Sequence, residues 1–190
     1  MKKSFLMVLA LLLLAACERE YEQNPDPNHT HADFAVWVDG QQVDFSGSEY
    51  MSGVSYDEHS HDEESEYHHE HLHLHDEIGH VVHRHKPGLT LREFFNSLEF
   101  VFPEPIERWT MWINGEQFDF NLDYQFQDMD QILLTNSAGS AEVLHQVEQL
   151  TDDACLYSRT CPWRGDPPAE NCIADPAIPC VVPEGDLDDF

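Results

Sequence analysis

Basic residues are scarce in this chain. Nine Lys and Arg residues stand against 37 Asp and Glu residues in a chain of 190, and the formal net charge at pH 7 is −28. A surface of this sign repels phosphate groups, which excludes DNA and RNA as partners. It attracts cations instead, although solubility or adaptation to salt explains most of the carboxylates equally well.

Long apolar runs are also scarce. The run at residues 5–14 stands out, but its length of about ten residues is too short to cross a bilayer as a mature helix. Two lysines precede this run and two alanines follow it. This order predicts an export signal peptide over residues 1–16. Its removal takes away two basic residues and no acidic residue, so the net charge changes from −28 to −30.

The end of this segment, Leu14-Ala15-Ala16-Cys17, resembles the lipobox of bacterial lipoproteins. We therefore predict that Cys17 is acylated and that residues 17–28 form a lipid anchor and a flexible tether to the membrane. Glu18 replaces the aspartate that retains lipoproteins at the inner membrane, which favours the periplasmic face of the outer membrane or the cell surface. Ordinary secretion with cleavage near Ala16 is the alternative.

Cysteine is rare beyond this signal, and its spacing excludes two kinds of site. An even number of further cysteines in an exported chain predicts two disulfides, with three possible pairings. No C-x-x-C spacing occurs, so the sequence predicts neither a thioredoxin-like redox pair nor a zinc ribbon. The four cysteines are Cys155, Cys161, Cys172 and Cys180.

Histidine, in contrast, is concentrated in one short segment. Six of the 13 histidines lie between positions 71 and 85, where histidine first alternates with leucine. Alternation predicts a strand with histidines on one face, followed by a turn at 76–79 and a returning strand at 81–85. A glycine bulge at Gly79 would place His73 opposite His83 and His71 opposite His85. A one-residue slip in register would separate them.

Four imidazoles on one strand face predict a metal site. Neutral imidazole is the commonest protein ligand for Zn²⁺ and Cu²⁺. Asp76 or Glu77 would then orient a ring from behind. The histidines of the preceding acidic stretch would form a weaker, mobile collecting arm; they are His59, His61, His68 and His69.

Composition divides the rest of the chain. Residues 29–150 are predicted to form one α+β domain, interrupted at 52–70 by a His- and acid-rich loop with too few apolar residues to become ordered. Residues 151–190 are rich in cysteine and proline, which predicts an irregular tail stapled by disulfides.

An internal repeat divides the domain into similar halves. Residues 34–45 and 109–120 align without gaps and share five of twelve positions, including Trp37 with Trp112. Each copy reads as a strand, an Asp-Gly or Asn-Gly turn and a second short strand, which predicts two β-hairpins. The matching tryptophans are most simply core residues.

Helical spacing occurs twice. Thr90 and Glu93 have capping-box spacing before the apolar stripe Leu91, Phe94, Phe95 and Leu98, which predicts a helix across the sheet. After a strand at 132–135, residues 141–150 predict a second, short helix buried through Val143, Leu144, Val147 and Leu150. Together these elements predict an α+β fold with a small mixed or antiparallel sheet and one packed helix, and they suggest a β-grasp-like topology.

With these motifs in place, the chain resembles a family of small exported bacterial and archaeal proteins whose members often carry a protein-disulfide-isomerase label. The absence of C-x-x-C gives that label no chemical basis here. The resemblance makes His31, His73, His75, His83 and His85 the characteristic histidines. It is carried by residues 31–40 with 43–46, 73–76 with Gly79 and 82–85, 88–95, 112–115 and 154–162.

These patterns favour an exported lipoprotein that captures or buffers Zn²⁺ or Cu²⁺ outside the cytoplasm. The candidate ligands are His31, His71, His73, His75, His83 and His85. An interaction or assembly module at the cell surface is the alternative, in which the histidines are merely polar or respond to pH and the protein partner is unknown. A metalloenzyme is less favoured, because no nucleophile–base pair stands out.

Overall fold

The computed structural model describes residues 20–52, 71–166 and 168. Within these residues, seven strands form one open mixed sheet with the order β3-β4-β1-β7-β5-β6, and β2 pairs with β1. The strands are β1 (Thr30–Val38), β2 (Gln41–Gln42), β3 (Leu72–His73), β4 (Val81–Arg84), β5 (Thr110–Ile113), β6 (Glu116–Asp119) and β7 (Asp130–Thr135). The helices are α1 (Leu91–Ser97), α2 (Ser140–Val147) and α3 (Ala154–Tyr157), with 3₁₀ turns η1 (Ser48–Tyr50), η2 (Ile106–Arg108) and η3 (Pro162–Arg164).

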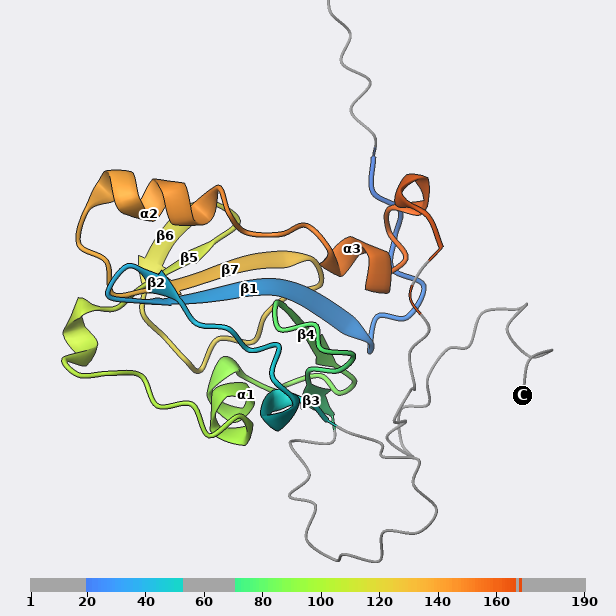
Figure 1. The fold of residues 1–190 in the computed structure, drawn as a ribbon. Coiled ribbons are helices and arrows are strands. Elements are labelled where there is room, and N and C mark those ends of the chain that lie inside the picture. Colours follow the sequence, from blue (N-terminus) through green and yellow to red (C-terminus); the bar gives the residue numbers. More distant parts are fainter. Residues whose placement is uncertain (1–19, 53–70, 167, 169–190) are drawn as a thin grey trace, which may run out of the picture.

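The centre of the sheet is a parallel pair made of its first and last strands. β1 and β7 run parallel, with Phe34 beside Ile132, while the other neighbours are antiparallel. Helix α1 lies across one face of this sheet (Figure 1), and the arrangement confirms the prediction of an α+β fold with a mixed sheet.

Both predicted hairpins are present, and their turns explain the repeat. Asp39 and Gly40 have φ angles of 49° and 81°, and Asn114 and Gly115 have 52° and 81°. Two consecutive positive φ angles give the tight turn whose twist matches that of the flanking strands. Trp37 and Trp112 then pair with Gln42 and Gln117, so the two hairpins have the same register.

Helix α1 and the sheet face beneath it form the main core. Thr90 accepts a hydrogen bond from the Glu93 amide, and the Glu93 carboxylate accepts one from the Thr90 amide, so the predicted capping box is confirmed. The stripe on this helix is almost fully buried against Phe34 and other apolar residues of the sheet. Burial of these aromatic and aliphatic side chains is the main contribution to stability.

Helix α2 covers the opposite face of the sheet (Figure 1). Val143 packs there against Ala35 and Leu133. The prediction was wrong about Leu144, which is 55% exposed, while Gln146 is buried. The buried side of this helix follows positions 143, 146 and 147, and position 144 is turned about 100° away from its neighbour. Trp37 and Trp112 are only half-buried and pack against the edge of this cluster, so they are less buried than the predicted core residues.

The two ends of the described chain pack against each other. The Tyr21 hydroxyl donates to Asp152 at 2.9 Å, and the Glu22 amide donates to the Thr160 carbonyl at 2.7 Å. The tether and tail predictions did not anticipate these contacts, nor the helix α3 at the start of the tail. Tethers are identified by polar composition, which does not report contacts with a segment more than a hundred residues away.

A Cys155–Cys161 disulfide closes a short loop here and confirms the expected cross-link in the C-terminal region. Cys17, Cys172, Cys180, the signal peptide and most of the loop at 52–70 lie outside the described residues, as do their predictions. In the part of the chain that is described, no helix combines the length and the apolar character needed to cross a membrane.

Candidate metal centre

Strand pairing gathers the histidines predicted from the sequence. His73 on β3 lies opposite His83 on β4, and His31 on β1 lies opposite His83 from the other side. The His85 amide donates to the His71 carbonyl at 2.9 Å, which continues the same register. The predicted register of this hairpin is therefore confirmed, and β1 adds a third strand to it.

The turn between β3 and β4 differs in detail from the predicted glycine bulge. Its positive φ angles belong to Asp76 (57°) and Glu77 (59°) and not to Gly79. Gly79 instead passes close to another part of the backbone, since a Cβ added there would lie 2.4 Å from the Phe45 carbonyl carbon. Close packing is therefore the reason for a glycine at this position.

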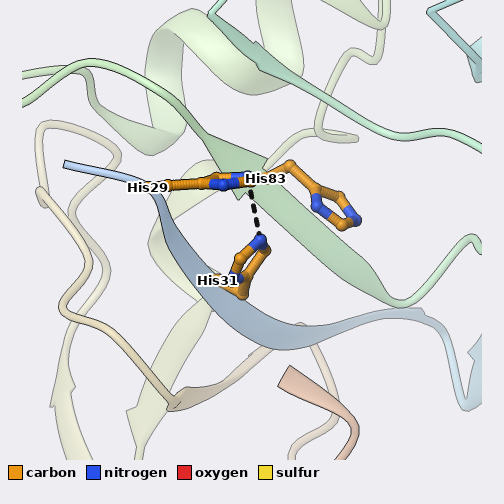
Figure 2. A group of neighbouring side chains, drawn as sticks. All are labelled: His29, His31 and His83. Carbon is orange, nitrogen blue, oxygen red and sulfur yellow. Dashed lines mark hydrogen bonds between the residues drawn. The ribbon is translucent and has the colours of Figure 1, made fainter. Parts of the chain in front are cut away.

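Three histidines form a group with the geometry of a metal site. One ring nitrogen from each of His29, His31 and His83 lies within 4.8 Å of the other two. Figure 2 shows His31 on β1 and His83 on β4, with the His29 ring approaching them from the chain just before β1. His31 and His83 are fully buried and His29 is half-buried, so the group lies at the edge of the interior.

Three further imidazoles extend this group into one continuous cluster. The His85 ring stacks on His29 with centroids 4.0 Å apart, and His73 stacks on His85 at 5.0 Å. The His75 ring lies 4.0 Å from His83. Burying so many polar rings costs free energy unless their nitrogens are satisfied. Among the described residues, this concentration of buried imidazoles makes the cluster the candidate for a functional site.

Residues from the C-terminal half orient the His31 ring. His31 Nδ1 lies 2.8 Å from Ser158 Oγ, and Ser158 Oγ donates to Asp128 Oδ1 at 2.5 Å. A hydroxyl has one proton, and Ser158 gives it to the carboxylate, so Ser158 must accept from His31 Nδ1–H. The lone pair of His31 is then on Nε2. That nitrogen directs its lone pair at His29 Nε2, which lies 3.1 Å away.

The turn carboxylate orients a second ring. His75 Nδ1 lies 2.6 Å from Asp76 Oδ2, and because the carboxylate accepts, Nδ1 carries the proton. His75 Nε2 then faces His83 Nδ1 at 3.2 Å. Carboxylate–histidine pairs of this kind are the usual support of metal-binding histidines. The sequence predicted that Asp76 or Glu77 would orient a histidine ring, and in the structure Asp76 makes this contact.

Helix α3 covers the cluster. The Tyr157 ring lies 4.8 Å from that of His83 and 5.6 Å from that of His31. The helix is fixed by the buried carboxylate of Asp33 on β1, which accepts hydrogen bonds from the Ala154 and Asp153 amides, both at 2.9 Å. Burial raises the pKa of Asp33, and these donors together with Thr151 limit the rise.

The structure divides the six candidate ligands into three kinds. His31 and His83 belong to the three-histidine group, while His73, His75 and His85 are in ring contact with it. His71 is half-buried and immediately precedes β3. Sequence reasoning missed His29, although His29-Thr30-His31 repeats the His-x-His spacing of the hairpin and carried the signal needed to find it.

Residues 69–73 also match the letters of the H-E-x-x-H zinc-protease motif, with His69, Glu70 and His73 at the motif positions. That motif places its two histidines on one face of a helix. His73 belongs to strand β3 instead, so the match does not indicate a protease site. His69 and Glu70 lie outside the described residues.

Comparison of the chain with protein-family models, curated proteins and solved structures gives no match. The resemblance to exported proteins therefore stays a prediction, and the case for function rests on the geometry of the cluster.

Proposed function

We propose that this protein binds a divalent transition-metal ion, Zn²⁺ or Cu²⁺, at His29, His31 and His83. The observation that carries the proposal is the convergence of three ligand nitrogens within 4.8 Å at a buried position. An ion bound there would satisfy several buried imidazole nitrogens at once. It would offset the cost of gathering the six rings of the cluster.

The spacing of the nitrogens supports this class of ion. Two ligands at about 2.0–2.1 Å from a tetrahedral zinc ion are about 3.3 Å apart. His29 Nε2 and His31 Nε2 are separated by 3.1 Å. An all-imidazole set suits Zn²⁺ and Cu²⁺, whereas Ca²⁺ and Mg²⁺ prefer oxygen ligands. Of the neighbouring rings, His75 contacts the group through a nitrogen, since its Nε2 atom lies 3.2 Å from His83 Nδ1 while Asp76 holds its Nδ1 atom.

The biological role follows from the expected location. If residues 1–16 direct export and Cys17 is acylated, the centre faces a compartment outside the cytoplasm. A buried all-histidine site there would capture or buffer scarce metal. The strongly acidic surface would concentrate cations around the protein.

Metal content is the first test. The chain from Glu18 onward, purified without a histidine tag, should contain about one Zn or Cu per chain by mass spectrometry. Substituting alanine for both His31 and His83 should abolish the bound ion, because each supplies a ligand. His29→Ala, at a half-buried position, should weaken binding with less disturbance of the fold.

His145→Ala is the matched control. It removes one imidazole from the exposed face of α2 and should leave the metal content unchanged. Replacing His59, His61, His68 and His69 together tests the proposed collecting arm and should lower only weak, additional binding. The proposed centre would be overturned if the metal content falls when these loop histidines are replaced but does not change when His29, His31 and His83 are replaced. The interaction-module interpretation would then be favoured.

A further inference from the structure

The disulfide loop holds two residues that contact the histidine centre. Cys155 and Cys161 are both buried and cross-linked, and the segment between them contains Tyr157 and Ser158. Tyr157 covers the His31 and His83 rings, while the Ser158 hydroxyl oxygen accepts a hydrogen bond from His31 Nδ1–H. The loop therefore contributes to the centre although it supplies none of its nitrogens.

Asp128 joins this loop to strand β1. Its Oδ1 atom accepts from the Ser158 hydroxyl at 2.5 Å and from the His31 amide at 3.0 Å. One carboxylate oxygen thus fixes both the backbone of His31 and, through Ser158, the proton on its ring. This double contact selects the tautomer in which His31 Nε2 is free of its proton and directed at the centre.

The cross-link is one of the contacts that hold the loop in place. Helix α3 has four residues, far fewer than a helix needs to be stable by itself in water. Its position depends on the Asp33 cap at one end and on the disulfide, which also brings the Thr160 amide to the Cys155 carbonyl at 2.9 Å. Opening the cross-link would remove one of the restraints that hold Ser158 against His31, leaving its hydrogen bond to Asp128.

We propose that the Cys155–Cys161 loop is the positioning shell of the histidine centre, with Ser158 and Asp128 as positioning residues, so that tight metal binding requires the disulfide. This inference rests on the proposed metal site. Because disulfides form and persist in oxidising compartments, the centre is complete only in chains that have reached one. Metal loading then follows formation of the S–S bond, in which the two thiols lose two protons and pass two electrons to a disulfide-bonded oxidant of that compartment, which is reduced to its dithiol.

The test measures Zn²⁺ affinity by competition with a chromogenic chelator on the chain from Glu18 onward, which retains every described residue. Ser158→Ala should lower the affinity about 10- to 100-fold, as expected for loss of the partner of a ligand histidine. Ser158→Thr keeps the hydroxyl and should restore most of the affinity. Replacing Cys155 and Cys161 together by alanine should lower the affinity at least as much as Ser158→Ala.

A spectroscopic measurement separates positioning from general damage. Long-range ¹H–¹⁵N spectra of the histidine rings report which nitrogen carries the proton. In the metal-free protein, His31 should be the Nδ1–H tautomer, and Ser158→Ala should change that pattern for His31 while leaving His145 unchanged. Circular dichroism identifies any variant that has not folded. If the variant without Cys155 and Cys161 does not fold, the comparison of Ser158→Ala with Ser158→Thr tests the positioning role.

The matched control replaces Cys172 and Cys180 together by alanine, which removes the same number of cysteines outside the loop. It should keep wild-type affinity. Equal zinc affinity in the wild type, Ser158→Ala and the Cys155/Cys161 variant would overturn the positioning role while leaving the metal site intact. No zinc binding by the wild type would instead overturn the proposed function itself.

Discussion

At His31, both ring nitrogens have partners, one distant in the sequence and one only two residues away. Nδ1 contacts Ser158 from the C-terminal loop, and Nε2 faces His29 at the end of the N-terminal segment. His145, by comparison, is exposed on α2. The same amino acid is thus a candidate ligand or a surface residue, and its neighbours decide which.

Gly79 offers a test of packing at a single position. A Cβ at this residue would lie 2.4 Å from both the Phe45 carbonyl carbon and the Ser46 amide nitrogen, which are backbone atoms and cannot move independently. Gly79→Ala should therefore destabilise the protein by about 1–3 kcal/mol, the usual cost of overpacking. Urea denaturation of the metal-free protein measures this difference.

Gly139→Ala is the companion variant. A Cβ there meets only the Glu142 side chain, at 3.7 Å, so the free energy of unfolding should change by less than half as much. Equal effects of the two substitutions would show that the close approach of Gly79 to Phe45 does not constrain the hairpin.

Sequence reasoning reached part of the centre and missed the rest for a physical reason. Alternation along the chain was enough to pair His73 with His83, because strand periodicity is a local property. The contact of His31 with Ser158 spans 127 positions, and no local pattern marks either residue as a partner of the other. Contacts of this kind depend on how the sheet and α3 pack.

At the scale of elements, local signals were sufficient wherever a turn or cap has its own chemistry. The Asp-Gly and Asn-Gly turns and the capping box of α1 formed where they were predicted. The orientation of α2 was less predictable, because Leu144 and Val143 are both apolar and only the sheet surface decides which is buried.

Asp153 links three elements and provides a pH-dependent test. Its carboxylate accepts from Arg164 on η3 at 2.6 Å and contacts His80 before β4 at 3.0 Å. Burial alone would raise the pKa of Asp153, but hydrogen bonds and charge from Arg164 and His80 lower it overall. A carboxyl with a lowered pKa stabilises the fold above its unfolded pKa, about 3.9, and loses this contribution as the pH falls through the folded value.

Asp153→Asn should therefore reduce the free energy of unfolding at pH 7 by up to about 1 kcal/mol, since a partly exposed pair is screened by solvent. The difference from wild type should shrink as the pH falls from about 5 to below 3. Urea titrations across this range measure it. In a protein that already carries Asp153→Asn, Arg164→Gln should cause little further destabilisation. If the two destabilising effects are fully additive, the Asp153–Arg164 pair does not contribute to stability.

At the scale of the whole molecule, the sheet brings the centre together from both ends of the sequence. β1 and β7 are parallel neighbours although about a hundred residues separate them, and α3 packs beside β1 (Figure 1). The class of fold was predictable from its hairpins and helix. The placement of the N-terminal segment against the C-terminal loop was not, because it depends on this long-range pairing.

The net charge of the molecule sets the background for any measurement of metal binding. With 37 acidic residues against nine basic ones, the folded chain repels itself, and any cation that screens this repulsion stabilises it to some extent. Stabilisation by zinc is therefore informative only in comparison with a divalent ion that the histidines do not bind. Mg²⁺ is suitable, because it prefers oxygen ligands.

Zinc should raise the melting temperature well beyond the effect of magnesium at equal concentration. An ion that binds only the folded chain contributes about 2.7 kcal/mol when its free concentration is 100 times the dissociation constant. Differential scanning calorimetry in the presence of a chelator, Mg²⁺ or Zn²⁺ measures the three melting temperatures. His83→Ala should respond equally to the two ions, because only screening remains, whereas His145→Ala should keep the full zinc response. If Zn²⁺ and Mg²⁺ raise the melting temperature of the wild type equally, the histidine cluster does not bind zinc and is only a polar part of the core.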